Sequence, residues 1–288
     1  MQAEMFRHRL QRKFIDKNGM AMDFLRFALL TPLLLVVGCE ESRNLATLCE
    51  KHTEICNEFE ADSWCRRERV EVGFNNLSLK EQPTELKKYH LLIAYENYAA
   101  CMNHAAKIEH IKLKDKKTKR VNNYIKAKQQ IERLSEETAT SEHPELLYYH
   151  WARYLNEKSL AKFLALEDSP LLQNSLSQFN LATYYIKRDP DKTIDLLFRS
   201  LELHDPNEEV NVEIFKTLST IFEEKQKVKQ AYIWSKILQL YRPDDKLINS
   251  DALHRFKNEY ALDFDFLDKV ADATYDKIND GIFVAPRH

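Results

Sequence analysis

Glycine is scarce in this sequence, since the 288 residues contain only four of them. Gly19 and Gly38 lie near the N-terminus, whereas Gly73 and Gly281 are isolated from each other and from any other glycine. A phosphate-binding loop of the P-loop or dinucleotide type needs several glycines close together, so that the backbone can approach the phosphates. The sequence therefore excludes a nucleotide site of these types, and it offers few glycine turns for β-hairpins.

The sequence also lacks an apolar run that is long enough to span a membrane. The main apolar stretch, residues 24–37, is interrupted by Arg26 and is shorter than the roughly 20 residues that a transmembrane helix needs. A basic segment at residues 7–17 precedes the stretch, and a Gly-Cys pair at 38–39 follows it. This order is typical of a secretory signal peptide. A buried core helix is the alternative interpretation.

The end of the stretch, Leu33-Leu34-Leu35-Val36-Val37-Gly38-Cys39, resembles the lipobox of bacterial lipoproteins. The resemblance implies that residues 1–38 are a lipoprotein signal peptide and that Cys39 carries palmitate and the lipid anchor. Glu40 replaces the Asp that commonly keeps such lipoproteins at the inner membrane. We therefore expect the protein to be lipid-anchored on the periplasmic side, and we favour the outer membrane over the inner membrane. Two internal methionines offer alternative starts for a shorter leader, Met20 and Met22.

Neither sign of charge dominates the chain. It contains 43 Lys and Arg against 45 Asp and Glu, and the leader is basic, so the mature chain is more acidic still. We expect no nucleic-acid partner. The run from Lys112 to Arg120 is densely basic and could contact lipid headgroups or an anionic polymer. We prefer a solvated helix face or connection, because no aromatic residues interleave with the lysines.

Four cysteines remain after Cys39, and an even number suits two disulfides in an oxidising compartment. These candidates are Cys49, Cys56, Cys65 and Cys101. Their spacings lack the Cys-x-x-Cys pairs of a zinc site, so unpaired or metal-bound thiols are the weaker alternative. Three pairings are possible. A helical hairpin of residues 63–74 and 84–111, folded near Leu79, would favour Cys56 with Cys101 and Cys49 with Cys65.

Helical periodicity runs through most of the remaining chain, and residues 143–245 contain a loose repeat. Related segments begin at Ala152, Ala182 and Leu218, with spacings of 30 and 36 residues that bracket the roughly 34 residues of a tetratricopeptide repeat. The glycine of that repeat is missing here. We predict an all-α fold, in which helical hairpins stack as a tetratricopeptide-like array after a disulfide-stapled N-terminal helical region.

Aromatic residues are concentrated in these repeats, where they can either anchor a bound peptide or pack between helices. Core packing is the more common role of any single aromatic. The candidates for partner binding are Tyr148, Tyr149, Trp151, Tyr184, Tyr185 and Trp234.

The sequence shows no recognisable catalytic motif. A His-Glu-x-x-His helix and a Gly-x-Ser-x-Gly turn are both missing. His104 and His110 are six residues apart and face different sides of a helix, whereas His143 and His150 are two turns apart. We interpret each as a surface or hydrogen-bonded histidine. We therefore expect no catalytic residues, no metal and no cofactor, although an enzyme is not excluded.

Three patterns resemble an uncharacterised family of envelope lipoproteins from Gram-negative bacteria, which is defined as a domain of unknown function. They are Leu48-Cys49…Cys56…Trp64-Cys65-Arg66-Arg67-Glu68-Arg69, Leu146-Leu147-Tyr148-Tyr149-His150-Trp151 and Leu181-Ala182-Thr183-Tyr184-Tyr185. The resemblance covers nearly the whole mature chain, but it implies no activity and no catalytic residue.

The predicted organisation has five segments: the signal peptide 1–38, a Cys-rich segment 39–83, long helices with the basic stretch 84–142, tetratricopeptide-like repeats 143–245, and C-terminal helices with a tail 246–288. We expect a lipid-anchored periplasmic scaffold that binds a protein or peptide partner in the envelope and has no catalytic activity. The alternative is a periplasmic enzyme that acts on peptidoglycan or another envelope polymer.

Overall fold

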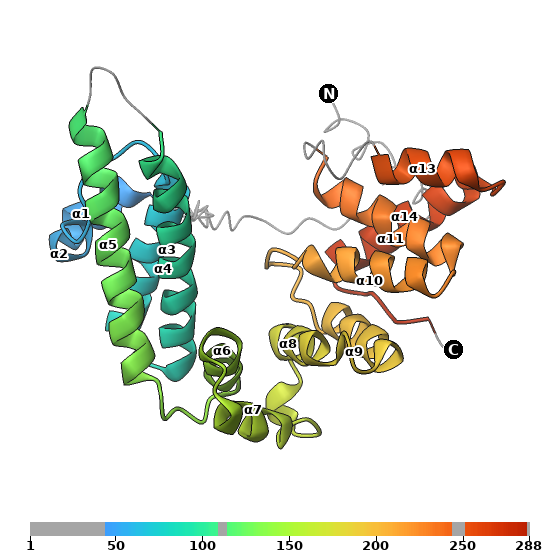
Figure 1. Ribbon diagram of the computed structural model, residues 1–288, viewed down its shortest axis with the longest axis horizontal. Helices are drawn as coiled ribbons and strands as arrows, with labels where there is room; N and C mark the ends of the chain where they lie inside the picture. The colour runs from blue at the N-terminus through green and yellow to red at the C-terminus, as the bar shows by residue number, and fades with distance from the viewer. Residues whose placement is uncertain (1–43, 109–113, 244–250, 287–288) are drawn as a thin grey trace, which may run out of the picture. The chain divides into compact units, whose positions relative to one another are not determined.

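The computed structural model describes residues 44–108, 114–243 and 251–286. The predicted signal peptide and Cys39 lie outside the described residues, as do Lys112 and Leu113 of the basic run. Every regular element of the described chain is a helix, as Figure 1 shows, which confirms the all-α prediction. None of the described helices combines the length and the hydrophobicity that are needed to cross a membrane.

The first five helices form what we call the N-terminal bundle. They are α1 (Leu45–Lys51), α2 (Thr53–Cys56), α3 (Arg66–Glu81), α4 (Glu85–Ala106) and α5 (Lys114–Glu137). Thr84 begins α4 by accepting a hydrogen bond from the backbone of Lys87, which is the usual role of a threonine N-cap. Helix α4 contacts both α3 and α5, and it therefore supplies most of the bundle core.

Gly73 lies where α1 packs closely onto α3. A Cβ atom at this position would lie 2.7 Å from Leu48 Cδ2, which is too close for two carbon atoms. Both residues are buried, so the missing side chain of Gly73 makes room for the methyl group of Leu48. This glycine therefore has a packing role.

Three helix pairs follow and make up the helix-pair region. They are α6 (Pro144–Tyr154) with α7 (Glu157–Leu164), α8 (Ser175–Tyr185) with α9 (Pro190–Glu202), and α10 (Glu213–Glu224) with α11 (Val228–Tyr241). A short 3-10 helix, η1 (Pro170–Leu172), connects the first two pairs. Asn156, Asn174 and Asp189 cap α7, α8 and α9, and Pro144 and Pro190 stand in the first turns of α6 and α9.

The C-terminal helices α13 (Asp251–Glu259) and α14 (Phe264–Asn279) pack against α11. One apolar core runs from α8 to the residues after α14, and it includes Phe198, Trp234 and Phe283. The chain turns after α14 at Gly281, whose φ of +66° favours glycine. A Cβ here would also lie 3.0 Å from Pro206 Cδ.

The turn between α3 and α4 falls at residues 82–84, where the predicted Cys-rich segment ends. The two helices on either side of this turn share one apolar core with α5 and the start of α6. The predicted segments 39–83 and 84–142 therefore form a single structural unit. The predicted repeat segments coincide with the three helix pairs.

Candidate functional site

The four cysteines form two disulfides, as predicted, but the favoured pairing was wrong. Cys49 is bonded to Cys56 and Cys65 is bonded to Cys101. The error comes from placing the fold of the hairpin at Leu79, four residues before its observed centre at Pro83. Cys65 and Cys101 each lie 18 residues from Pro83, so they face each other across the hairpin.

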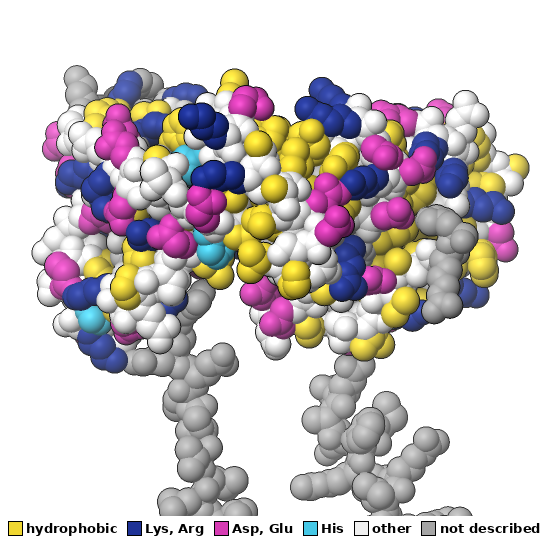
Figure 2. Space-filling model, turned by 90° about the horizontal axis from the view of Figure 1, so that it is seen from below, with side chains coloured by type: hydrophobic (Ala, Val, Ile, Leu, Met, Phe, Trp, Pro, Cys, Tyr) yellow, Lys and Arg dark blue, Asp and Glu magenta, His cyan; other side chains and the backbone are white. Residues whose placement is uncertain are grey.

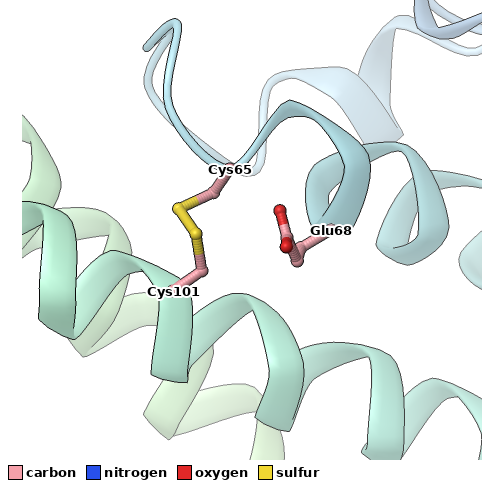
Figure 3. Close-up of side chains that lie close together, drawn as sticks. All are labelled: Cys65, Glu68 and Cys101. Atoms are coloured by element: carbon pink, nitrogen blue, oxygen red, sulfur yellow. A yellow bond between two sulfur atoms is a disulfide. The ribbon is translucent and has the colours of Figure 1, made fainter. Parts of the chain in front are cut away.

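Glu68 lies beside the second disulfide, as Figure 3 shows. Its carboxylate and the two sulfur atoms of Cys65 and Cys101 lie within 4.8 Å of one another. No other group of three such ligand atoms occurs among the residues that the structure describes. Because both sulfur atoms are bonded to each other, they do not offer the thiolates that metals such as Zn²⁺ bind.

The segment between the disulfides, residues 57–64, has no helix and is held on the bundle by buried polar contacts. Arg120 of α5 is fully buried, donates to Asp62 Oδ2 at 3.1 Å and donates to the carbonyl of Ala105 at 2.9 Å. Its guanidinium also lies over the ring of Trp64, 5.4 Å from the centroid. The end of the basic run is therefore not a solvated face, whereas Lys117 and Lys119 before it are exposed.

Further contacts fix the same segment. Asn123 donates to the carbonyl of Glu60 and accepts from its N–H, at 2.9 and 2.8 Å. Tyr95 donates its hydroxyl proton to Glu58 at 2.8 Å, and burial raises the pKa of Glu58. Arg69 donates to the carbonyls of Cys56 and Phe59. These groups explain how a segment without regular structure keeps one conformation.

Two of the six predicted binding aromatics are buried. Tyr149 is 2% exposed and packs between α6 and α4, where its hydroxyl donates to Glu96 at 3.1 Å. Trp234 is 5% exposed and stacks against Phe215 in the C-terminal core. In this structure both residues pack between helices and offer no surface to a partner.

The other four candidates form a continuous surface that we call the aromatic row, Tyr148, Trp151, Tyr184 and Tyr185. All four are partly exposed, and they come from α6 and α8. Neighbouring ring centroids lie 5.5, 5.7 and 4.9 Å apart along the row. Within the described residues, neither the indole N–H of Trp151 nor the hydroxyl of Tyr184 has a hydrogen-bond partner.

Cationic side chains lie over one end of the row. Arg188 lies 4.1 Å from the ring centroid of Tyr184, and Lys192 lies 4.0 Å from that of Tyr185. Lys192 also forms an ion pair with Glu167, which accepts a hydrogen bond from the Tyr185 hydroxyl. Tyr185 therefore already contacts Glu167 and Lys192. The indole N–H of Trp151 and the hydroxyl of Tyr184 have no hydrogen-bond partner within the described residues.

Charged side chains of both signs cover one face of the molecule. On the face drawn in Figure 2, Lys and Arg side chains are interspersed with Asp and Glu side chains, and hydrophobic side chains lie among them. Such a surface gives no broad field of one sign that would attract a polyanion.

Three of the four histidines discussed above lie in the described residues, and their surroundings differ. His150 is buried, and its Nε2 lies 3.1 Å from the hydroxyl of Thr138. His143 Nδ1 lies 2.8 Å from Glu145 Oε2. His104 is exposed, and His110 lies outside the described residues. The prediction of surface or hydrogen-bonded histidines is confirmed for the three that are described.

Sequence reasoning missed Arg120 and Glu145, although the periodicity carries a signal for both. Arg120 shares a helix face with the buried residues Asn123 and Ala127, at helical spacing. Glu145 stands four residues before Tyr149, on the face of α6 that packs onto the bundle. A charged residue on a core-facing stripe is expensive to bury alone, so it implies a buried partner.

The fold and these surfaces define an all-helical protein, with a disulfide-bonded bundle followed by helix pairs that present partly exposed aromatic side chains. The chain belongs to the family described as "Protein of unknown function (DUF2989)", which matches residues 36–236. The matched residues include both disulfides and the aromatic row. No curated protein and no solved structure matches the chain.

Proposed function

We propose that this protein is a lipid-anchored, non-enzymatic scaffold of the cell envelope. Its helix-pair region acts as a tetratricopeptide-like array and binds a protein or peptide partner. The mature chain is attached through Cys39 to the periplasmic leaflet of the outer membrane. The anchor precedes the bundle in the sequence, and the aromatic row provides the contact with the partner.

The aromatic row is the observation that carries this proposal. Aromatic side chains with a polar tip supply large contact areas at little cost in conformational entropy, and they are enriched among the residues that dominate binding energy. Trp151 and Tyr184 have such tips without partners within the described chain. Helix pairs that stack on one another also leave a surface on which a peptide segment can lie.

Two features support the envelope location. The sequence before Cys39 has the order of a lipoprotein signal peptide, and the two disulfides suit an oxidising compartment such as the periplasm. Fractionation of membranes tests the location. The protein is expected to float with outer-membrane markers, and flotation with inner-membrane markers would contradict this part of the proposal.

Labelling with radioactive palmitate tests the anchor. Cys39→Ser removes the only thiol that the signal sequence presents, so the variant is expected to lose the label and to accumulate as unprocessed precursor. Cys49→Ser is the control, because it also removes one thiol but leaves the lipobox intact. Continued labelling of Cys39→Ser would refute the anchor.

Mild crosslinking in cells, followed by purification, tests the binding surface. The double variant Trp151→Ala and Tyr184→Ala is expected to recover a stoichiometric partner at least about tenfold less well than the unchanged protein. Phe266→Ala is the matched control, since Phe266 is an aromatic of α14 that is 60% exposed and lies outside the row. Circular dichroism confirms that the double variant remains folded. Unchanged recovery by a folded double variant would contradict the proposal.

A further inference from the structure

One end of the N-terminal bundle, which we call the basic end, gathers cationic side chains. It is the end at which α4 stops and α5 begins, and the two helices lie side by side there (Figure 1). The disulfide between Cys65 and Cys101 joins the start of α3 to the last turns of α4, so α3 begins at the same end. The cationic side chains there that are at least partly exposed are Arg66, Lys107, Lys116, Lys117 and Lys119.

Fewer carboxylates than cations lie at the basic end. Asp62 is bound to the buried guanidinium of Arg120, so this pair adds no net charge. Glu60, Glu68 and Asp115 remain, and five exposed cations therefore face three carboxylates. On the face drawn in Figure 2, by contrast, charges of both signs are interspersed. The basic end thus carries a local excess of positive charge, which attracts an anionic surface.

An exposed tryptophan belongs to the same end. Trp64 directly precedes Cys65 and is 48% exposed, and the guanidinium of Arg120 lies 5.4 Å from its ring centroid. The basic run contains no aromatic residue of its own, and this absence favours a solvated helix face when the run is considered alone. The fold supplies the missing aromatic from the segment 57–64. Tryptophan is enriched where a membrane meets water, because its ring is apolar and its N–H is polar.

The chain between the predicted lipid anchor and the bundle is short. Five residues lead from Cys39 to Asn44, and an extended chain of this length spans at most about 17 Å. Asn44 caps α1, and Leu45 at the start of α1 lies beside Gly73 of α3. Gly73 is seven residues, or about 10 Å, along α3 from Arg66. A membrane that holds acyl chains on Cys39 is therefore within reach of the basic end.

We propose that the basic end docks on the membrane surface by binding the anionic headgroups of phospholipids. The inference rests on the proposed function in one respect, since the lipid anchor brings the bundle to the membrane. The exposed lysines of α5 and Arg66 lie against the lipid phosphates, and Trp64 enters the boundary between headgroups and acyl chains. This contact adds to the attachment that acyl chains provide, and it determines which end of the bundle meets the membrane.

Quenching of tryptophan fluorescence by brominated lipids tests the docking surface. The full mature protein is purified from cells in detergent and added to vesicles of brominated phosphatidylcholine, with or without phosphatidylglycerol as the anionic lipid. Phosphatidylglycerol is expected to increase the quenching at least about twofold at about 0.1 M salt. The increase should vanish at about 1 M salt, where the screening length falls from about 10 Å to about 3 Å. Equal quenching in both kinds of vesicle at the lower salt concentration would overturn the proposal.

Two tryptophan variants assign the signal to a residue. Trp64→Phe keeps a ring over Arg120 but removes the fluorophore at the basic end, so the increase caused by phosphatidylglycerol should disappear. Trp151→Phe is the matched control, because Trp151 belongs to the helix-pair region, and it should keep the increase. An increase that persists in Trp64→Phe would contradict the placement of this residue at the membrane.

Lysine variants test the charge of the basic end. The triple variant Lys107→Gln, Lys116→Gln and Lys119→Gln is expected to lower the increase at least about twofold, because each exposed cation near an anionic membrane contributes to binding. The control makes the same charge change at three exposed lysines outside the bundle, Lys158, Lys229 and Lys269. Circular dichroism confirms that both triple variants remain folded. An unchanged increase in the folded triple variant of the basic end would overturn the proposal.

The mass of the same preparation separates the docking surface from the anchor. If the protein is acylated at Cys39 but phosphatidylglycerol does not increase quenching, the docking surface is wrong and the anchor stands. If the protein lacks acyl chains but shows the increase, the anchor is wrong and the docking surface stands. Heparin is the probe for a soluble polyanion. Heparin binding that needs the three lysines, without any effect of phosphatidylglycerol, would assign the basic end to such a polymer and overturn the membrane assignment.

Discussion

The N-terminal bundle and the helix-pair region are both rich in aromatic residues, but the two regions use them differently. In α4 of the bundle, Tyr89, Tyr95 and Tyr98 are buried, because α3 and α5 both contact this helix. In the helix-pair region, the aromatic row on α6 and α8 remains partly exposed. Aromatic content alone therefore says little about binding. An aromatic side chain lies in the core if other helices cover its face of the helix, and at the surface if they do not.

The two regions also differ in what stabilises them. The bundle includes a segment without regular structure, residues 57–64, and holds it with two disulfides and buried polar groups. The helix-pair region has short connections, side-chain caps such as Asn174, and large apolar faces on α9 and α10. The bundle should consequently depend on a few strong links, whereas many small contributions stabilise the helix pairs.

The largest expected effect comes from Arg120→Met. This change leaves the buried carboxylate of Asp62 without its partner, so the free energy of unfolding should fall by about 3 to 5 kcal/mol. Lys119→Met is the control, because Lys119 is the adjacent exposed cation. Adding Asp62→Leu to Arg120→Met should recover part of the loss. Urea unfolding measures all three variants, and a loss below about 1 kcal/mol in Arg120→Met would contradict the role of the ion pair.

Removal of the disulfides should destabilise the N-terminal bundle but not the helix-pair region. Loop-closure entropy predicts a loss of about 4 kcal/mol for the Cys65–Cys101 bridge, which closes 36 residues, and about 2.5 kcal/mol for Cys49–Cys56, which closes seven. The serine variants are compared by urea unfolding and by hydrogen exchange. Exchange should rise in α3 to α5 and stay unchanged in α9 to α11. Equal losses of protection in both regions would show that the disulfides do not stabilise the bundle selectively.

A smaller effect concerns alkaline pH. Burial raises the pKa of Tyr89 to about 12, compared with about 10 in an unfolded chain. A raised pKa in the folded state means that the stabilisation is complete below pH 10 and is lost as the pH rises toward 12. Tyr89→Phe cannot ionise, so between pH 10 and 11 it should lose about 1 kcal/mol less stability than the unchanged protein. An identical loss in both proteins, measured by urea unfolding, would contradict this pKa.

Much of the fold could be predicted from local patterns in the sequence. Prolines such as Pro144 and Pro190 mark helix starts, and apolar spacing finds the three helix pairs because each pair buries one face. The pairing of the cysteines could not be found, because it depends on the exact turn between two helices. A shift of four residues in that turn, from Leu79 to Pro83, changes which cysteines face each other.

The candidate site was predicted in part. Sequence composition identifies Tyr149 and Tyr148 equally well, yet one is buried against α4 and the other belongs to the aromatic row. Adjacent residues on a helix point in different directions, and only the packing of other helices decides which direction is covered. The buried ion pair between Arg120 and Asp62 was not predicted, because the two residues lie 58 positions apart and Asp62 belongs to a segment without regular structure.

Site-specific photocrosslinking tests most directly whether the aromatic row, and not the bundle, contacts the partner. A photoreactive phenylalanine derivative replaces Tyr184 in the row, or Val121, a 38% exposed residue of α5. Both variants are made as the full chain in cells and irradiated. The Tyr184 position is expected to give one discrete adduct of defined mass and the Val121 position none. An adduct from Val121 alone, or the same adduct from both positions, would contradict the assignment of binding to the aromatic row.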